Sequence, residues 1–336
     1  MEELRQIIGS WQLQPLAADT VQDNVWKVYT EEGVYALKNS RLEEKRLFFI
    51  ANAQRTLVRN GFQKFAHAID MSPGQPFFRQ GKDHFCLSEW VEGEPCDFNC
   101  PRHLLAAGKT LGEFHLYSRN ISSFQGAEGR VSYFRWPEKF ASRTGDLEDF
   151  AFLAKAKKHP NAFEQMYLSH YESFREQARS ARRLLFTSDY ARLAREAAQV
   201  KSFIHYDVAA RNFIIQGELA YLIDFDYCAL DLPAVDLMRL IKRALKDGYA
   251  AREKLMTILS GYQSMRRVTK SEFQLIYALL FFPQKFWRLS QRYFCQAHTW
   301  SDETFARKME GTIRELGYEE KWLPLYRDIC ESGAWS

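Results

Sequence analysis

Two short apolar segments that each deliver an acidic residue to a loop constrain this chain more than any other feature. The first, IHYDVAARN, carries Asp207 and Asn212, and the second, YLIDFDYC, carries Asp224. Between them lie two strand-like runs, NFII and AYLI, separated by a QGE turn, which together predict a hairpin. Because a hairpin brings its two ends together, we expect these three polar side chains to lie near one another.

This set of side chains suits phosphoryl transfer. Carboxylate and amide oxygens are the ligands that Mg²⁺ prefers, and Mg²⁺ usually shares substrate phosphates, so Asn212 and Asp224 are candidate metal ligands. Asp207 lies upstream of the first strand, where it could accept a hydroxyl proton. A lysine that ends an earlier strand, Lys38, would complete the set. Asp226 is either a second metal ligand or a surface or capping residue. Taken alone, Asp207 and Asn212 could be turn formers.

The first 95 or so residues predict a small β-rich part with one helix. The stretch NVWKVYTEEGVYALK is rich in β-branched and aromatic residues around an EEG turn and predicts a hairpin that ends at Lys38. Residues 42–60 repeat apolar positions at helical spacing, and Gly61 is a plausible helix stop. The stretch FFRQGKDHFCLSEWV predicts a second hairpin, broken by Gly93 and Pro95.

The rest of the chain is mainly helical in pattern. Helices are expected at RHLLAAGKTLGEFHLYS, over most of 145–200, at LDLPAVDLMRLIKRALK and through 250–336. Residues 155–195 hold nine Lys or Arg against four Asp or Glu. This basic segment is either a solvated helix face or a binding surface for an anionic partner.

The bulk composition excludes several classes of protein. The 336 residues suit two lobes or domains, and the 15% aromatic content argues against disorder. No apolar run is long enough to span a membrane, and the N-terminal stretch lacks an apolar signal core, so we expect neither a membrane segment nor secretion by that route. A net charge of +4 does not call for nucleic acid. The six scattered cysteines favour reduced thiols over a zinc site.

The motif block HYDVAARN…YLIDFDYCALDLPAVDL resembles the aminoglycoside phosphotransferase/choline kinase superfamily, which has a protein-kinase-like fold. Within it, NFII…YLIDFDY…DLPAVDLMRL most resembles the spore-coat-associated CotS-type proteins of endospore-forming bacteria. The resemblance implies an α+β bilobal fold with a small β-rich N-lobe over 1–93. The large helical C-lobe, 94–336, would hold the catalytic and metal-binding loops and a helical insertion around 118–200.

The resemblance also implies a role for each matching position. Lys38 would contact the nucleotide phosphates, and Glu43 or Glu44, early on the next helix, would hold Lys38. The backbone of residues Glu89 to Val91 would line the adenine pocket. The remaining roles fall on the motif block: Asp207 as catalytic base, His205 bracing its loop, Asn212 and Asp224 holding Mg²⁺, and Asp236 as a structural anchor in the following helix. ATP and Mg²⁺ are the implied cofactors.

Two departures from the superfamily pattern keep a second function open. The segment between the first two strands, PLAADTVQDNVW, has no glycine to let backbone N–H groups approach phosphates, and its Asp19 and Asp23 add negative charge. Tyr206 stands where superfamily members usually have glycine. The chain is therefore either an ATP- and Mg²⁺-dependent phosphotransferase acting on a small-molecule or coat hydroxyl, or a catalytically weak or inactive scaffold in spore coat assembly. By resemblance, we expect it in the mother-cell cytoplasm and then in the coat, with other coat proteins as partners.

Overall fold

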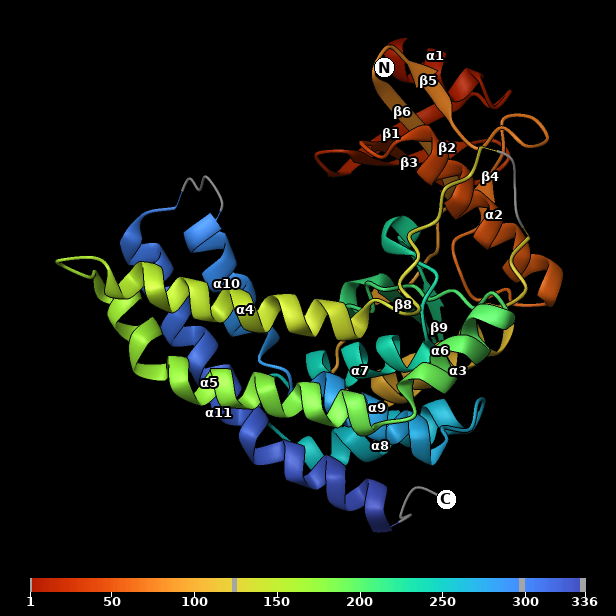
Figure 1. Ribbon diagram of the computed structural model, residues 1–336. Helices are drawn as coiled ribbons and strands as arrows, with labels where there is room; N and C mark the ends of the chain where they lie inside the picture. The colour runs from red at the N-terminus through yellow and green to blue at the C-terminus, as the bar shows by residue number, and fades with distance from the viewer. Residues whose placement is uncertain (1, 123–125, 296–299, 333–336) are drawn as a thin grey trace. The chain divides into compact units, whose positions relative to one another are not determined.

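The computed structural model describes residues 2–122, 126–295 and 300–332 (Figure 1). The chain divides into two compact units. Unit 1 comprises Met1–Val131, Val200–Asp231 and Gly261–Arg266, and unit 2 comprises Ser132–Gln199, Leu232–Ser260 and Arg267–Ser336. Antiparallel sheets in unit 1 and many helices confirm the predicted α+β class. The lobe boundary proposed between residues 93 and 94 stays a prediction.

Unit 1 is built on a six-stranded antiparallel sheet with the order β1-β2-β3-β6-β4 and β5 paired to β6, and on a smaller sheet, β7-β8-β9. Both hairpins predicted for the first part of the chain are present, as is the hairpin of the motif block. Its elements are α1 (Glu2–Gly9), β1 (Pro15–Gln22), β2 (Val25–Thr30), β3 (Val34–Ser40), α2 (Glu44–Asn60), β4 (Ala68–Ile69), β5 (Phe78–Gln80), β6 (Asp83–Glu89), β7 (Glu94–Pro95), α3 (Pro101–Tyr117), η1 (Ala210–Asn212), β8 (Phe213–Gln216), β9 (Leu219–Leu222) and η2 (Phe225–Tyr227).

The short helix α1 is held to the large sheet by its apolar face. Ile7 and Ile8 are buried and form one cluster with Val28 and Leu37 of the sheet. Trp11, which follows the helix, joins this cluster and donates its indole N–H to a strand β4 carbonyl at 2.8 Å. Burying an aromatic ring while satisfying its polar group is the usual arrangement for tryptophan, so this contact fixes one end of the sheet.

The helix α2 ends where the sequence predicts. Gly61 takes the left-handed conformation with φ 102°, and its N–H donates to carbonyls of the last turn. The following amide, that of Phe62, donates to Leu57 O at 2.9 Å. These bonds satisfy carbonyls that the helix end would otherwise leave unpaired, and glycine adopts this backbone at little cost.

Two glycines explain why residues 261–266 belong to unit 1. A Cβ at Gly112 of α3 would lie 2.5 Å from Tyr262 O, and one at Gly261 would lie 2.6 Å from Leu105 O. Only a residue without a side chain allows this close approach. His115 of α3 further bonds the Tyr262 hydroxyl at 2.7 Å, so the segment is fixed against α3.

Unit 2 is helical. Its helices are α4 (Trp136–Lys155), α5 (Ala162–Thr187), α6 (Tyr190–Gln199), α7 (Pro233–Ala244), α9 (Lys270–Phe281), α10 (Gln284–Cys295) and α11 (Asp302–Ser332), and α8 (Ala251–Gln263) begins in it. The long α5 starts with a capping box, in which Asn161 accepts from the Glu164 N–H and Glu164 accepts from the Asn161 N–H. Tyr167 of α5 stacks on Phe286 of α10 with ring centroids 5.0 Å apart, within a largely aromatic core.

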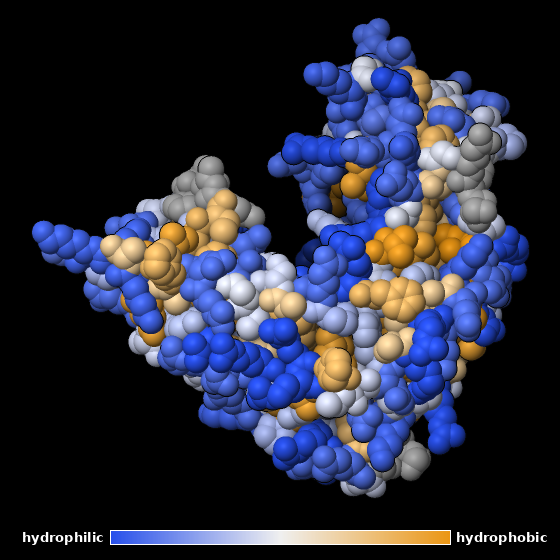
Figure 2. All heavy atoms as spheres, in the orientation of Figure 1, coloured by the Kyte–Doolittle hydropathy of each residue, from blue (hydrophilic) through white to orange (hydrophobic). Residues whose placement is uncertain are grey.

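The surface of unit 2 carries several apolar side chains. Phe152 and Leu153 of α4 and Phe186 of α5 are exposed, and apolar patches over these helices are visible in Figure 2. No helix in the described ranges is both long and apolar enough to cross a bilayer.

Candidate active site

The hairpin β8–β9 positions the residues of the motif block in unit 1. Its two-residue turn contains Gly217, whose φ of 63° is one that glycine adopts readily. Phe213 pairs with Leu222, and the amide that follows β9 donates to Asn212 O at 3.0 Å. Asn212 and Asp224 therefore stand at the same end of the hairpin, as the sequence predicts.

The loop before β8 is tied together by Asp207. Its carboxylate accepts from Asn212 Nδ2 at 2.9 Å and from an Arg211 guanidinium N–H at 2.9 Å. Asn212 Nδ2 also donates to the Asp207 backbone carbonyl at 2.7 Å. Asp207 and Asn212 are both buried. These bonds use the amide nitrogen of Asn212 and leave its Oδ1 as the acceptor atom suited to a metal.

Lys38 lies between two aspartates. Its ammonium forms ion pairs of 2.8 Å with Asp224 and 2.8 Å with Asp226. Burial opposes the charged form, but Asp226 and Asp224 outweigh it, and the pKa of Lys38 is raised above its ordinary value. The ammonium therefore stays charged at neutral pH and holds the two carboxylates together.

The partner that the resemblance implied for Lys38 is different in the structure. Glu44 pairs with Arg79 at 3.0 Å and with His84 at 3.4 Å, both on the β5–β6 hairpin. Glu43 is exposed at the N-terminal cap of α2. The prediction that one of these glutamates holds Lys38 is thus corrected. The orientation of α2 places the Glu44 side chain against the β5–β6 hairpin and not beside Lys38.

A cavity of about 520 Å³ in unit 1 brings most of the predicted residues together. Its volume falls in the range of roughly 300–1,000 Å³ that small-molecule sites occupy. Among its described lining residues are Lys38, Glu89, Val91, Asp207, Asn212, Asp224 and Asp226.

Where β6 reaches the cavity, its last residues are still hydrogen-bonded to neighbouring segments of unit 1. The Glu89 amide donates to His67 O at 2.9 Å, and the Trp90 amide donates to Val34 O at 3.0 Å. The next amide along the chain is that of Val91, which lines the cavity. An adenine edge needs a main-chain donor of this kind, and the role of this segment in binding adenine stays a prediction.

His205 is not among the cavity-lining residues that the structure describes. It is fully buried, its Nε2 lies 3.0 Å from Ile223 O, and its ring packs edge-on against Phe225 at 4.9 Å. This position suits bracing of the two loops, because the ring links the segment before Asp207 to the one that carries Asp224. Asp236 is likewise fully buried, in the first turn of α7 in unit 2.

Two arginines that the sequence analysis did not single out support these loops. Arg46 of α2 donates to the backbone carbonyls of Asp226, at 3.0 Å, and Cys228. Arg211 binds Asp207 and lines the cavity. The i,i+4 spacing to Asp207 could have indicated Arg211, whereas Arg46 contacts a loop about 180 residues away in sequence and no local pattern marks it.

The backbone near the site is unusual at two residues. Tyr206 has φ 71° and Asp224 has φ 63°, both in the left-handed region. Aspartate tolerates this region, but tyrosine adopts it only at a cost of about 1 kcal/mol or more. The Arg130 guanidinium lies over the Tyr206 ring at 5.3 Å from its centroid, which helps to hold the ring in place.

The donor set suits a metal only together with phosphate oxygens. Among the described residues, no group of three or more His, Cys, Asp or Glu is arranged to hold a metal ion. Two aspartates and one amide oxygen nevertheless match Mg²⁺, which is commonly bound by one or two carboxylates plus substrate phosphates. Cys86 also lines the cavity, but burial raises the pKa of its thiol to about 12, so it is no thiolate nucleophile.

The stretch between the first two strands forms a turn and no open loop. β1 and β2 are joined through only Asp23 and Asn24, with Gln22 paired to Val25. Asn24 is tied to Asn39 by two bonds, of 2.9 and 3.1 Å. The amides here belong largely to strands, so this segment offers phosphates less backbone than a glycine-rich loop would.

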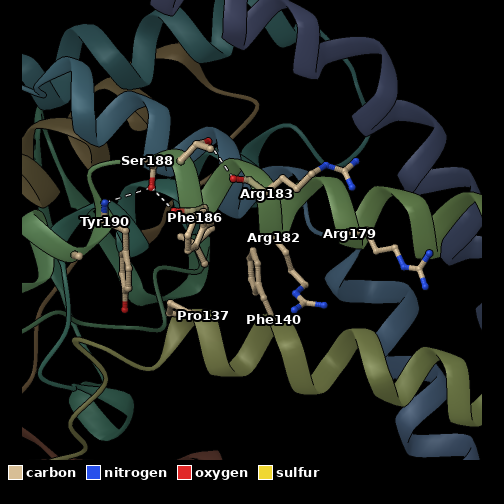
Figure 3. A pocket seen from close by; sticks show the side chains of 11 residues that line it. Pro137, Phe140, Arg179, Arg182, Arg183, Phe186, Ser188 and Tyr190 are labelled. Carbon is tan, nitrogen blue, oxygen red and sulfur yellow. Dashed lines mark hydrogen bonds between the residues drawn. The ribbon is translucent and has the colours of Figure 1, made fainter.

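The predicted basic segment contributes a groove in unit 2. Of its nine cations, Lys157, Arg175, Arg179 and Arg192 pair with acids, whereas Arg182 and Arg183 have no acidic partner in the described part of the chain. A groove of about 690 Å³ lies beside them, and Figure 3 shows Pro137 and Phe140 of α4 facing Arg182 and Phe186 of α5 across it. Binding of an anionic partner to this surface stays a prediction.

Comparison with known proteins places the chain among kinase-like proteins. The family model described as "spore coat putative kinase YutH" matches residues 5–325. "Spore coat protein S" of Bacillus subtilis (strain 168) is 23% identical over 292 residues, which cover 86% of this chain and 82% of that protein.

Two solved structures share the fold. An aminoglycoside phosphotransferase from Alicyclobacillus acidocaldarius gives a TM-score of 0.82 at 23% identity, covering 97% of this chain and 96% of that chain. A spectinomycin phosphotransferase, solved in complex with ADP and spectinomycin, gives a TM-score of 0.64 at 13% identity, covering 95% of this chain and 98% of that chain. These likenesses confirm the predicted kinase-like phosphotransferase fold.

Proposed function

This chain belongs to the spore coat putative kinase YutH family, and from that premise we propose that it transfers the γ-phosphoryl group of ATP to a hydroxyl of a small molecule or a coat component. One observation carries the proposal: Lys38, Asp207, Asn212 and Asp224 line a single cavity of unit 1. These are the side-chain types that phosphoryl transfer needs for the phosphates, the acceptor proton and the metal.

Asp207 acts as the general base. As the acceptor oxygen forms its bond to the γ-phosphorus, the bond to the bridging oxygen of ADP breaks, and the hydroxyl proton passes to the Asp207 carboxylate. Asn212 and Arg211 both donate to this carboxylate, so they fix its orientation. His205 and Arg46 brace the segments on either side.

Asn212 Oδ1 and the Asp224 carboxylate would hold Mg²⁺, with Asp226 as the neighbouring carboxylate. When bound with ATP, Mg²⁺ neutralises charge that develops on the phosphates. Lys38 stands 2.8 Å from both aspartates and contacts the phosphates beside them. The backbone of Glu89 to Val91 binds the adenine edge.

Thermal unfolding with and without Mg²⁺ and ATP tests the nucleotide site. A ligand at 100 times its dissociation constant stabilises the folded state by about 2.7 kcal/mol, which is a shift of several degrees in Tm. We expect this shift in the wild type with both components present and its loss in Asp224→Asn. The matched control is Glu218→Gln, an exposed residue in the β8–β9 turn, which should keep the shift.

Transfer of radiolabelled γ-phosphate to a broad panel of hydroxyl acceptors, including coat extracts, then tests catalysis. Labelled product that disappears in Asp207→Asn supports the proposal. Nucleotide binding without transfer or hydrolysis across the panel contradicts it and favours the second candidate.

That second candidate is a kinase-like scaffold in coat assembly, catalytically weak or inactive. Two features favour it. The two-residue β1–β2 turn offers phosphates little free backbone, and Tyr206, with its left-handed φ, stands where superfamily members usually have glycine. It predicts that a strain carrying Asp207→Ala assembles a normal coat at normal protein levels. A defective coat under those conditions would rule it out.

The family assignment also supports a location. The protein is made in the mother-cell cytoplasm and then joins the coat, where other coat proteins are its partners. A fluorescent fusion that remains diffuse in the mother cell after coat formation would contradict this location.

A further inference from the structure

A second cavity, of about 710 Å³, lies in unit 2 beside α10 and α11. Ten described residues line it, and four of them are cations: Lys285, Arg288 and Arg292 of α10 and Lys308 of α11. Glu315 of α11 is the one acid among these ten. We call this the basic cavity. Its size suits a small molecule.

The cations gather here because of their helical spacing. Lys285, Arg288 and Arg292 follow one another at i, i+3 and i+7, which places them on one face of α10. Lys308 and Glu315 are spaced by seven on α11 and also share a face. On α10, cations three and four residues apart repel one another and destabilise the helix slightly. Helix stability therefore gives no reason for this arrangement.

Two of the cations are held by an aromatic ring. The Arg292 guanidinium lies 3.7 Å from the Trp300 ring centroid, and the Lys308 ammonium lies 4.2 Å from it. Neither they nor Arg288 has an acidic partner among the residues that the structure describes. A guanidinium stacked by its face keeps its N–H groups in the plane of the group, where they remain available to an anion.

Cations of α7, which do not line the basic cavity, lie near enough to Arg288 to act on it electrostatically. Burial lowers the pKa of Arg288, and Arg239 and Arg243 of α7 lower it further. Burial lowers the pKa of Lys285 to about 8; Glu319 opposes this, and Lys242 and Arg288 add to it. Lys285 pairs with Glu315, and Lys242 pairs with Glu319 at 3.0 Å. The one acid that lines the cavity is therefore already paired, and the other three lining cations keep their positive charge.

We propose that the basic cavity binds a small phosphorylated anion with at least two negative charges. Arginine forks match phosphate oxygens with paired, charge-assisted hydrogen bonds. Three cations without acidic partners at one cavity exceed what a single monovalent ion would neutralise. The site is separate from the nucleotide cavity, because all its lining residues belong to unit 2, and the proposal stands whether or not the chain is a kinase.

Isothermal titration with inorganic pyrophosphate tests the site. The full chain carries Lys38→Met throughout and Mg²⁺ is omitted, so that the cavity of unit 1 does not contribute. We expect saturable binding that weakens about tenfold or more in each of Arg288→Gln, Arg292→Gln and Lys308→Gln. Lys321→Gln is the matched control, because Lys321 is an exposed lysine on the same helix outside the cavity lining, and it should leave binding unchanged.

A second readout excludes misfolding. Because each substitution removes a cation from a crowded cluster, the variants should melt at the same or a higher temperature than the Lys38→Met parent at low salt. Fructose 1,6-bisphosphate, tested beside pyrophosphate, should also bind. Binding of pyrophosphate alone would still support the proposal and would restrict the ligand to the inorganic anion. Absence of binding, equal binding by the Arg288→Gln variant, or equal binding of sulfate at the same ionic strength would overturn the proposal.

Discussion

The cavity of unit 1 and the basic cavity of unit 2 differ in how their charges are balanced. In the first, Lys38 bridges Asp224 and Asp226, and Asp207 accepts from Arg211 and Asn212, so each of these charged groups has a partner within the cavity. In the second, Arg288, Arg292 and Lys308 line one cavity with a single acid among its described lining residues, and Arg292 and Lys308 lie over an indole ring. The charged groups of the first site are therefore paired, with carboxylates in excess, whereas most lining cations of the second have no acidic partner among the described residues.

The two cavities also differ in backbone. Tyr206 and Asp224 of unit 1 take left-handed conformations in loops, whereas the lining cations of the basic cavity all lie on regular helices. Strained loops are common where side chains must be held in one geometry for chemistry. The cations of the basic cavity instead lie along the faces of α10 and α11. This difference agrees with the two proposals, phosphoryl transfer in unit 1 and anion binding in unit 2.

Removing the proposed general base, Asp207, gives the strongest test of whether unit 1 carries out the chemistry. Asp207→Asn keeps the size of the side chain but accepts a proton poorly, so phosphoryl transfer should fall about 10²- to 10⁴-fold. The Mg²⁺- and ATP-dependent Tm shift should persist, because Lys38, Asn212 and Asp224 remain. The rate is followed as labelled product on the best acceptor, with Glu218→Gln as the control. A variant with wild-type turnover would show that Asp207 is structural.

Lys38→Met tests the internal balance of the unit 1 cavity. Lys38, Asp224 and Asp226 are each less than one third exposed, and removing the cation leaves two facing carboxylates, so we expect a loss of about 2 kcal/mol in the free energy of unfolding. Lys45→Met is the control, since Lys45 forms an ion pair with both side chains well exposed, and should cost less than about 0.5 kcal/mol.

The pH dependence of this difference has a definite sign. The folded-state pKa of Lys38 is raised, so its stabilising contribution is fully present below the unfolded lysine value near ~10.4 and is lost as pH rises through the folded pKa. Urea unfolding should therefore give the same wild-type-to-variant difference at pH 7 and pH 9. A difference that already shrinks by pH 9 would contradict the double ion pair.

Much of unit 1 could be predicted because its signals are local. The hairpin that ends at Lys38, the stop at Gly61 and the β8–β9 hairpin each rest on a few neighbouring residues, and each is present. The partners of Lys38 could not be predicted in this way. They depend on which face of α2 meets the sheet, and that orientation places Glu44 against Arg79 and His84.

The basic cavity had no sequence signal at all. Its cations come from the consecutive helices α10 and α11, with nearby charge from α7, which lies earlier in the chain, before α8 and α9. Within each helix, two or three cations at helical spacing look like a solvated face. Only the packing of α10 against α11 brings their cationic faces together. The cluster of cations can therefore be recognised in the structure but not in the sequence.

The pKa of Lys285 reports mainly its burial, with a smaller effect of the neighbouring cations. Because burial lowers its folded pKa to about 8, against an unfolded value near ~10.4, the folded state gives up its proton first and stability rises with pH between these values. We expect the wild type to gain about 1–2 kcal/mol in the free energy of unfolding between pH 7.5 and 10 relative to Lys285→Met. Chemical unfolding at both pH values checks this, with Lys321→Met as the exposed control. A flat difference would show that Glu315 neutralises Lys285.

The smallest effect concerns the strained loop of unit 1. At most positions glycine is less stable than alanine, because it loses more backbone entropy on folding. At Tyr206 the left-handed φ of 71° reverses the order, so Tyr206→Gly should be more stable than Tyr206→Ala by about 1 kcal/mol. Comparing the two variants cancels the loss of the ring and of its contact with Arg130. The control pair is Tyr227→Gly and Tyr227→Ala, at an exposed residue of η2 outside the left-handed region, where alanine should be the more stable. The same order at both sites, measured by urea unfolding, would show that the loop before Asp207 is relaxed and that strain does not distinguish the two cavities.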